Sequence, residues 1–335
     1  MDVREDVATA PRESNDLKTE FRHVPVMLGE VLETLSPHDG DIVCDCTLGG
    51  AGHSLELGKH CSPSGMLLGI DQDDEALAAA GARIRANIPE VVSLQLKGNF
   101  SQLDELLQRV QIPGVDCFLF DLGVSSHQLD TPERGFSYNE DAPLDMRMNP
   151  GTQTLTAAEV INTYTEADLT RILRTYGEEK WASRIAQFIV RERAKAPIQT
   201  TFQLVEVIKA TIPASQRRQG GHHPARKTFQ AVRIEVNHEL EALEQGLEAA
   251  LRWLNPGGRI CVISYHSLED RIVKGVFRKW SQGCTCPPDI PVCVCGNVPV
   301  IRLGERKPRV PSDEEIARNP RARSAKLRSA VKLDA

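Results

Sequence analysis

A glycine-rich loop between two short apolar runs constrains this 335-residue chain more than any other feature. The run 42–46 predicts a buried parallel strand, and three glycines follow it within residues 49–52, where a helix is expected to begin. A second apolar run, 66–70, leads directly to Asp71. Glycines in such a turn let the backbone approach a ligand, and an acid about 20 residues further on can accept hydrogen bonds from ribose hydroxyls. The order therefore predicts a nucleoside cofactor site.

The spacing of the glycines distinguishes between two kinds of cofactor. A dinucleotide fingerprint would read G-x-G-x-x-G, whereas this chain has Gly-Gly-Ala-Gly at 49–52, preceded by Asp45. That order is closer to the acid and glycine-rich loop of S-adenosylmethionine (SAM) methyltransferases. An ordinary strand-to-helix turn without a ligand can have a similar sequence, but the acid downstream favours a cofactor site. A third apolar run, 115–121, ends at Asp121, so three strand tips are expected to meet at one sheet edge.

Composition limits the class of protein. Apolar residues make up 41% and charged residues 26% of the chain, as in an ordinary globular protein. No apolar run approaches 18 residues, so no membrane span is expected. The first 20 residues resemble neither a secretory signal nor a transit peptide, and we expect a disordered leader there. Several cysteines lie inside apolar strands, and with no export signal we expect a cytoplasmic protein without disulfides.

The periodicity predicts an α/β fold: a Rossmann-like SAM-dependent methyltransferase sheet with an inserted all-helical subdomain. Strand and helix patterns alternate from about 41 to 121, but only helical patterns occur between residue 128 and residue 259. We expect a SAM-binding domain formed by 21–131 and 224–310, and an inserted helical substrate subdomain over 132–223. In the later part we expect helices over 156–175, 178–193 and 201–211, and then one long helix over 229–254. A strand over 259–264 and a helix over 268–280 are expected to follow.

Charge is unevenly distributed. The net charge is −6, yet residues 301–335 hold ten Lys or Arg against five acids, which gives +5 there and −11 elsewhere. We expect a basic C-terminal tail over 311–335, either a contact for a polyanion or a solvated terminal segment. A second basic cluster suits either a phosphate backbone or a solvated face; its members are Arg217, Arg218, His222, His223, Arg226, Lys227 and Arg233.

Four cysteines lie close together in a proline-rich stretch. Cys284 and Cys286 form one C-x-C pair, and Cys293 and Cys295 form another. Four thiolates can bind zinc tetrahedrally, although the usual ligand spacing is C-x₂₋₄-C. The alternatives are free thiols and transiently oxidised thiols, and the sequence leaves this choice open.

Beyond these patterns, the chain resembles one family, the RsmH (MraW) enzymes, which methylate N4 of a cytosine in the decoding region of 16S ribosomal RNA. The matching blocks occur in order over roughly 21–330, and the longest of them are specific on their own; they are residues 23–27, 47–53, 121–130, 134–137, 143–148, 176–179, 226–237, 264–274 and 319–324. The resemblance implies a cytosine-N4 methyltransferase that uses SAM and acts on small-subunit ribosomal RNA or the assembling 30S subunit.

The resemblance also implies the SAM contacts. By motif position they are Ala51, Gly52 and His53 in the first loop, Asp71 on the ribose, Phe100 beside the adenine, and Asp121 and Gln128. Two positions depart from the family's usual pattern, since residue 127 is His where Pro is frequent, and residue 51 is Ala where Gly is common. Each residue also has a plainer interpretation, such as helix capping for His53 and Asp71, capping of a turn for Asp121, and a core position for Phe100.

The expected chemistry is an in-line displacement at a sulfonium methyl, in which alignment of the reacting groups contributes much of the rate. A hydrogen-bond acceptor on the cytosine amine would make it more nucleophilic and take its proton. Backbone carbonyls after Asp121 are candidates, as are the side chains of Ser125, Ser126, Asp145 and His266. The loop after Asp121 contains no aromatic residue to stack on a base.

Other functions remain open from the residues alone. A methyltransferase on another RNA, a protein or a small molecule would use the same fold, and so would a nicotinamide oxidoreductase, although the G-x-G-x-x-G pattern is absent. A non-catalytic ribosome-assembly factor is a further alternative.

Overall fold

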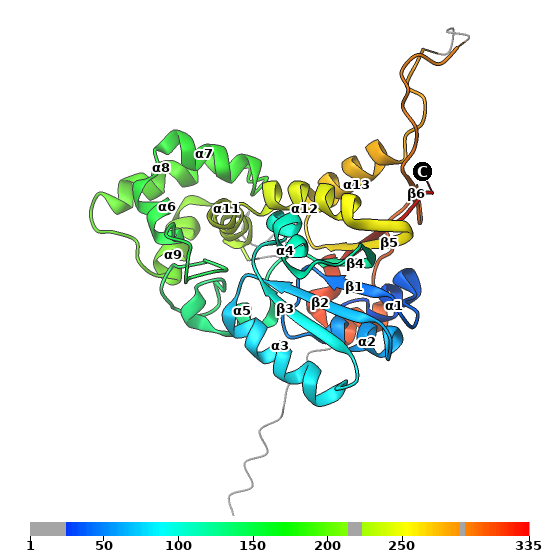
Figure 1. Ribbon diagram of the computed structural model, residues 1–335. Helices are drawn as coiled ribbons and strands as arrows, with labels where there is room; N and C mark the ends of the chain where they lie inside the picture. The colour runs from blue at the N-terminus through cyan, green and yellow to red at the C-terminus, as the bar shows by residue number, and fades with distance from the viewer. Residues whose placement is uncertain (1–24, 214–222, 288–291, 335) are drawn as a thin grey trace, which may run out of the picture.

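A seven-stranded sheet organises the protein. The computed structural model describes residues 25–213, 223–287 and 292–334, so the expected leader over 1–20 lies outside the described residues. The strand order is β3-β2-β1-β4-β5-β7-β6 (Figure 1), where β1 to β5 are parallel and β7 is antiparallel to both of its neighbours. The strands are β1 (Ile42–Asp45), β2 (Met66–Asp71), β3 (Val92–Lys97), β4 (Val115–Asp121), β5 (Leu254–Ser264), β6 (Ile301–Leu303) and β7 (Lys326–Lys332).

Each face of this sheet is covered by helices because successive side chains of a strand point to opposite faces. In β1, Val43 packs with the helices of one face and Cys44 with those of the other. The first face carries α1 (Leu28–Leu35), α2 (Gly52–Cys61) and α3 (Asp74–Asn87), and the second carries α4 (Leu103–Val110), α12 (Glu239–Trp253) and α13 (Ser267–Trp280). Both faces are buried, which explains the continuous apolar runs at β1, β2 and β4.

A separate cluster of helices lies beside the sheet (Figure 1). It contains α6 (Ala157–Thr163), α7 (Glu166–Thr175), α8 (Ala182–Arg193), α9 (Thr201–Thr211) and α11 (Arg226–Asn237). The expected α/β class, with a helical insertion in a Rossmann-like sheet, is confirmed. Since α11 packs in the core of this helical part, the insertion continues beyond residue 223, where the sequence predicted its end. The short helices α5 (Ser126–Asp130) and α14 (Asp313–Arg318) lie in loops.

The prediction of one long helix over 229–254 is wrong. The chain forms α11 and α12 with a break at His238, whose φ of 50° lies in the left-handed region. The apolar spacing of three or four continues across the break, so the pattern alone does not reveal it. The expected helix over 156–175 is likewise divided, because Thr165 caps a new helix through its side chain.

The prediction of a basic tail over 311–335 is also wrong. Residues 326–332 form β7, which lies between β5 and β6 inside the sheet. Arg328 and Lys326 pair with Asp270 of α13 at 2.7 and 3.3 Å, and the Lys332 ammonium donates to the carbonyl of Leu251 in the last turn of α12. The three positive charges of β7 are therefore held by a carboxylate and a helix end. Among the described residues, no helix is long and apolar enough to cross a membrane.

Replacement of Leu327 by alanine tests this placement of β7. Leu327 is 2% exposed, so its truncation removes buried apolar surface and leaves a cavity, with an expected cost of about 2–5 kcal/mol. Urea unfolding would measure the loss. Arg323→Ala, an exposed change outside the strand, should alter the free energy of unfolding by less than about 0.5 kcal/mol. Equal, small effects of both changes would contradict a buried β7.

Candidate functional site

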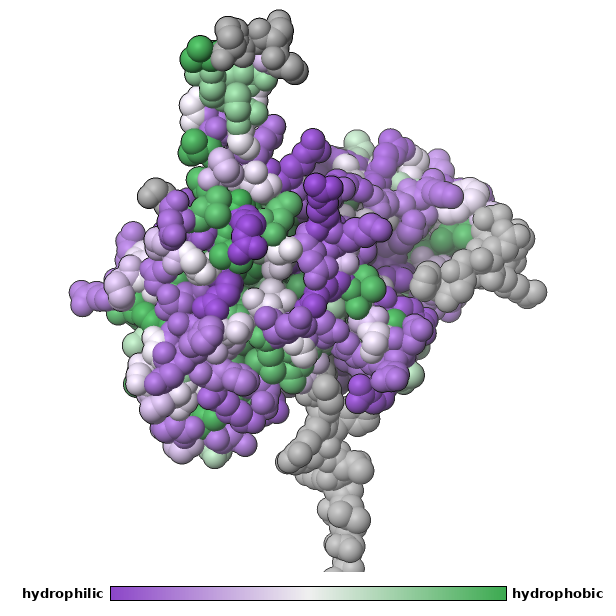
Figure 2. Space-filling model, turned by 90° about the vertical axis from the view of Figure 1, so that its right-hand side faces the viewer, coloured by the Kyte–Doolittle hydropathy of each residue, from purple (hydrophilic) through white to green (hydrophobic). Residues whose placement is uncertain are grey.

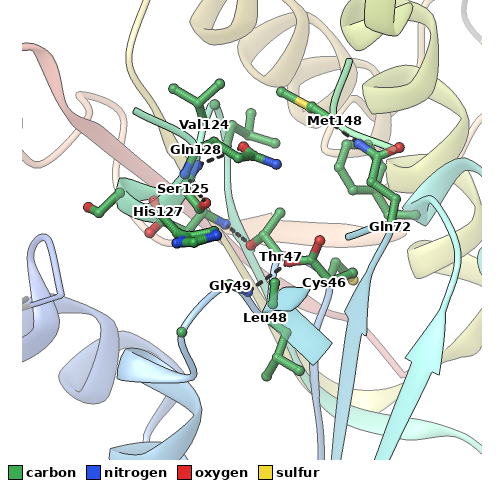
Figure 3. Close-up of a pocket in the computed structure, with 18 of the residues that line it drawn as sticks. Cys46, Thr47, Leu48, Gly49, Gln72, Val124, Ser125, His127, Gln128 and Met148 are labelled. Carbon is green, nitrogen blue, oxygen red and sulfur yellow. Dashed lines mark hydrogen bonds between the residues drawn. The ribbon is translucent and has the colours of Figure 1, made fainter. Parts of the chain in front are cut away.

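A large cavity lies at the carboxyl ends of β1, β2, β4 and β5. Its volume is about 860 Å³, and its walls come from the loops of the sheet and from α11 and α12. Figure 3 shows Thr47 and Gly49 of the loop after β1 facing Ser125 and Gln128, with Gln72 and Met148 at another side. Of the residues predicted as cofactor contacts, those that line the cavity are Gly52, His53, Asp71, Phe100, Asp121 and Gln128.

Ala51 is the exception among these predicted contacts. It is fully buried in the core between α1, α2 and the sheet, and it does not line the cavity. Its φ is 59°, a left-handed conformation that glycine adopts without strain. This geometry gives a physical reason for the glycine that is common at this position.

The loop after β1 is fixed by hydrogen bonds to its neighbours. The hydroxyl of Thr47 accepts the backbone N–H of Asp121 at 2.7 Å, which joins this loop to the end of β4. Gly49, with a φ of 46°, donates its N–H to Asp71 Oδ2 at 2.8 Å, which joins the loop to the end of β2. The glycine-rich turn is thus tied to the ends of β4 and β2, which carry Asp121 and Asp71.

Asp71 lies at the carboxyl end of β2 and is largely buried. It also accepts the backbone N–H of Asp73 at 3.0 Å. Burial raises the pKa of Asp71 to about 6 in spite of these two donors, because the charged carboxylate loses water that the protein only partly replaces. At neutral pH the group is ionised and can accept further hydrogen bonds from a ligand.

Asp121 forms a partly buried group with His53 and Tyr265. The Tyr265 hydroxyl donates to Asp121 Oδ1 at 2.7 Å, and His53 Nδ1 lies 3.6 Å from Asp121 Oδ2. His53 Nε2 is 2.9 Å from the carbonyl oxygen of Val26, which can only accept, so Nε2 carries a proton. Burial raises the pKa of both Asp121 and Tyr265. Tyr265 also supplies an aromatic ring at the cavity that the loop after Asp121 does not contain.

Phe100 is both a core residue and a wall of the cavity. Its ring meets Phe120 edge to face with centroids 5.7 Å apart, and it packs against α12 at Gly246, where an added Cβ would lie 2.8 Å from the ring. The two interpretations proposed for Phe100 are therefore compatible. One edge of the Phe100 ring packs against Phe120 and α12, and the rest of the ring faces the cavity, where it is open to a ligand.

The two candidate serines of the loop after β4 differ in whether their hydroxyls are already hydrogen-bonded within the protein. Ser125 and Gln128 form a reciprocal cap of α5, in which the Ser125 hydroxyl accepts the Gln128 N–H and the Gln128 side chain accepts the Ser125 N–H. The Gln128 amide also reaches Asp73 at 3.4 Å, so much of its polar capacity is used by the protein. Ser126 lines the cavity too, and its hydroxyl makes no hydrogen bond to another described residue.

The other two candidate proton acceptors lie elsewhere. Asp145 pairs with the guanidinium of Arg147 at 2.9 and 2.6 Å, and His266 caps α13 through Nδ1, with its Nε2 3.2 Å from Glu269 Oε1. Neither side chain lines the cavity. A role for either as the acceptor is not supported by this geometry.

The basic cluster predicted from the sequence is only partly present at the site. Arg233 is largely buried, lines the cavity and binds Glu239 through two hydrogen bonds of 2.8 Å, so it is not an open phosphate contact. Lys227 donates to the carbonyl of Glu178, and His223 stacks on Tyr138. Arg217, Arg218 and His222 lie outside the described residues.

Sequence reasoning missed the acidic groups on this side. Glu239 and Glu269 line the cavity beside Arg233, and Glu269 accepts the backbone N–H of Tyr265 at 2.8 Å. The Coulombic attraction of His266 and Arg233 keeps the pKa of Glu269 below its usual value against the effect of burial. The one available signal was Arg233 itself, a charged residue directly after Val232 in the apolar stripe.

Comparison with known proteins identifies the family. The MraW methylase family matches residues 20–333. The chain belongs to this family. Two curated relatives, both called "Ribosomal RNA small subunit methyltransferase H", come from Symbiobacterium thermophilum and Heliobacterium modesticaldum. The first is 56% identical to this chain, and the match covers 94% of this chain and 98% of the relative. The second is 53% identical, and the match covers 93% of this chain and 99% of the relative. A solved rRNA methylase of Streptococcus thermophilus is 11% identical, with a TM-score of 0.40, over 92% of this chain and 94% of its own.

Membership in the MraW methylase family makes the chain a methyltransferase, and its methyl donor is SAM. The cavity fits this donor. It has room for a nucleoside and a second group. Asp71 offers an ionised acceptor, and Phe100 offers an aromatic surface. Five acidic residues line the cavity, which suits a cationic sulfonium: Asp71, Glu75, Asp121, Glu239 and Glu269. The nicotinamide alternative is excluded by the family.

Gly52→Ala tests how closely the segment before α1 packs on the glycine-rich loop. An added Cβ would lie 2.6 Å from Pro25 Cγ, and relieving that overlap should cost about 1–3 kcal/mol of stability. Gly29→Ala is the matched control, because its Cβ would meet nothing within 4 Å in α1, and it should stabilise the protein by up to about 1 kcal/mol. Chemical denaturation compares the two; a stabilising Gly52→Ala would contradict the contact.

Proposed function

We propose that this chain transfers a methyl group from SAM to the exocyclic N4 of a cytosine in small-subunit ribosomal RNA. The observation that carries the proposal is one cavity in which the predicted cofactor residues of β1, β2 and β4 adjoin the loop after Asp121. The names of the relatives support ribosomal RNA of the small subunit as the substrate. The choice of N4 of cytosine rests on the motif resemblance.

We assign the cofactor contacts from the geometry of the cavity. Asp71 accepts the ribose hydroxyls, since it ends β2 with an ionised, largely buried carboxylate. Phe100 contacts the adenine with the ring surface left open by Phe120 and Gly246. The loop at Gly52 and His53 lies against the amino-acid part of the donor.

SAM, when bound, supplies a methyl group on a positively charged sulfur. The protein contributes alignment and charge. Asp121, held by Tyr265 and by the Thr47 hydroxyl, keeps a carboxylate near the reacting end of the cavity without the freedom to move. Fixed groups of this kind stabilise charge during the reaction without reorganisation.

The cytosine amine is a weak nucleophile because its lone pair is delocalised into the ring, and it must lose a proton on methylation. We assign the acceptor of that amine to the loop after Asp121, where Ser126 has an unengaged hydroxyl at the cavity. A hydrogen bond from the amine to Ser126 would favour the reactive geometry, and solvent would take the proton. A base reaches this depth only when it is unstacked, so the substrate segment is single-stranded or splayed.

The pKa of Asp71 predicts how cofactor binding depends on pH. Its raised value means that the free protein holds a proton on Asp71 below about 6, and a protonated carboxyl accepts hydroxyl groups poorly. The ribose favours the carboxylate, so affinity for SAM should rise about tenfold between pH 5 and pH 7 and then level off. Calorimetric titration over this range measures it.

Asp71→Asn is the control for that titration. It should weaken binding at pH 7 by about tenfold or more, because a charged acceptor is lost, and it should remove the rise between pH 5 and pH 7. An unchanged pH profile in the variant would show that another group causes the dependence.

Nucleoside mass spectrometry tests the reaction itself. Purified protein, SAM and small subunits or naked 16S RNA lacking the modification are incubated, and the RNA is digested and analysed. N4-methylcytidine is the expected product. A methyl group on another atom or base would reject the N4 assignment, and methylation of neither RNA form would reject ribosomal RNA as the substrate.

Two variants in the same assay test the acceptor. Ser126→Ala should lower the rate about fivefold to tenfold, as expected for the loss of one hydrogen bond. Asp145→Ala should reduce activity only as far as it reduces folded protein, since its carboxylate serves Arg147. A full rate with Ser126→Ala would assign the acceptor to a backbone carbonyl instead.

A further inference from the structure

An arm formed by residues 281–300 projects from the body between α13 and β6, and its described parts are 281–287 and 292–300 (Figure 1). Its base is closed by a hydrogen bond of 2.8 Å from the N–H of Val300 to the carbonyl of Trp280. The side-chain amide of Asn297 donates to the carbonyls of Gln282 and Gly283 at 3.0 and 2.8 Å. The two sides of the arm therefore meet in a defined register.

The arm has no hydrophobic core to hold it. Figure 2 shows it rising clear of the body, and its valines at 292, 294 and 298 are 69, 77 and 69% exposed. A segment that buries so little apolar surface does not offset the entropy lost on ordering. Small structures of this kind generally need a disulfide or a metal as a cross-link.

Four thiols lie at the place where such a cross-link would act. Cys284 and Cys286 come from one side of the arm, and Cys293 and Cys295 come from the other. All four sulfur atoms lie within 4.8 Å of one another, with Cys293 and Cys295 at 3.5 Å and Cys295 and Cys284 at 3.8 Å. All four cysteines are free, so they do not form disulfides.

These separations match a tetrahedral metal site. Zinc–sulfur bonds of about 2.3 Å place the ligands of a tetrahedron about 3.8 Å apart, whereas a disulfide needs about 2.05 Å. No described residue of the arm carries a charged side chain, so the thiols are the ionisable ligands there. Each C-x-C pair contributes two sulfurs from one side of the arm, and no helical turn is needed between the two cysteines of a pair.

The backbone around the thiols favours thiolates. The N–H groups of Thr285, Cys286 and Val294 point at the sulfurs of Cys295, Cys284 and Cys286, at 3.3, 3.4 and 3.4 Å. Such donors stabilise a negative sulfur in the way that the outer hydrogen bonds of metal sites do.

We propose that Cys284, Cys286, Cys293 and Cys295 bind one zinc ion as a tetrathiolate, which fixes the two sides of the arm to each other. Each ligand releases its thiol proton to solvent as its zinc–sulfur bond forms, and no electrons are transferred. The geometry is closed, with four protein ligands, so the site is structural and leaves no position for a substrate. It is independent of the methyl-transfer cavity.

Metal analysis of the full chain, purified with reductant and without added metal, tests this proposal. We expect about one zinc per chain. The double variant Cys284→Ser and Cys293→Ser, which removes one ligand from each side, should retain less than about a tenth of that amount. Val294→Ser lies between two ligands and removes none, so it should keep the full zinc content.

Cobalt substitution and folding measurements make the outcome decisive. Chelator-treated wild type loaded with Co²⁺ should show the visible absorption of a tetrahedral cobalt thiolate, and Zn²⁺ should displace it. Cooperative urea unfolding reports whether each sample is folded, independently of any methyltransferase activity. Folded wild type that contains no metal, holds iron instead of zinc, or has these cysteines joined as disulfides would overturn the proposal.

Discussion

Three aspartates end three neighbouring parallel strands, and their carboxylates can be buried only where donors replace the lost water. Asp45 accepts the hydroxyl of Ser54 at 2.6 Å, Asp71 accepts the N–H of Gly49 at 2.8 Å, and Asp121 accepts the hydroxyl of Tyr265 at 2.7 Å. These donors come from the loops and helix starts that follow the strands. Because each carboxylate needs hydrogen-bond donors, the loops that supply these donors are held in place. The shape of the cavity follows from the positions of these loops.

The sequence was most informative where one physical rule acts alone. Strands buried on both faces need continuous apolar runs, so β1, β2 and β4 were predictable, and the acids at their tips had to meet at one edge. Gly52, Asp71 and Asp121 lie at one cavity, as expected. The family resemblance added the cofactor and is supported by the match over residues 20–333.

The sequence was misleading where contacts in the folded chain override a local sequence pattern. The apolar stripe of α11 and α12 keeps helical spacing through His238, yet each half packs on a different core, so the backbone turns there. Strand β7 carries lysine and arginine because Asp270 and the end of α12 lie beside it, a context that no local pattern reveals. The partners of Arg233 and Asp145, which are Glu239 and Arg147, are likewise visible only in the folded chain.

The chain crosses between the sheet and the helical part at two places, residues 126–134 and 237–239. Gln128 and Glu239, one from each crossing, line the cavity. Asn237 fastens the second crossing to the loop before α6, where it binds the carbonyl of Met146 and the N–H of Met148, both at 2.8 Å. The cavity thus lies between the two crossings. Any displacement of the helical part relative to the sheet would therefore change the width of the cavity.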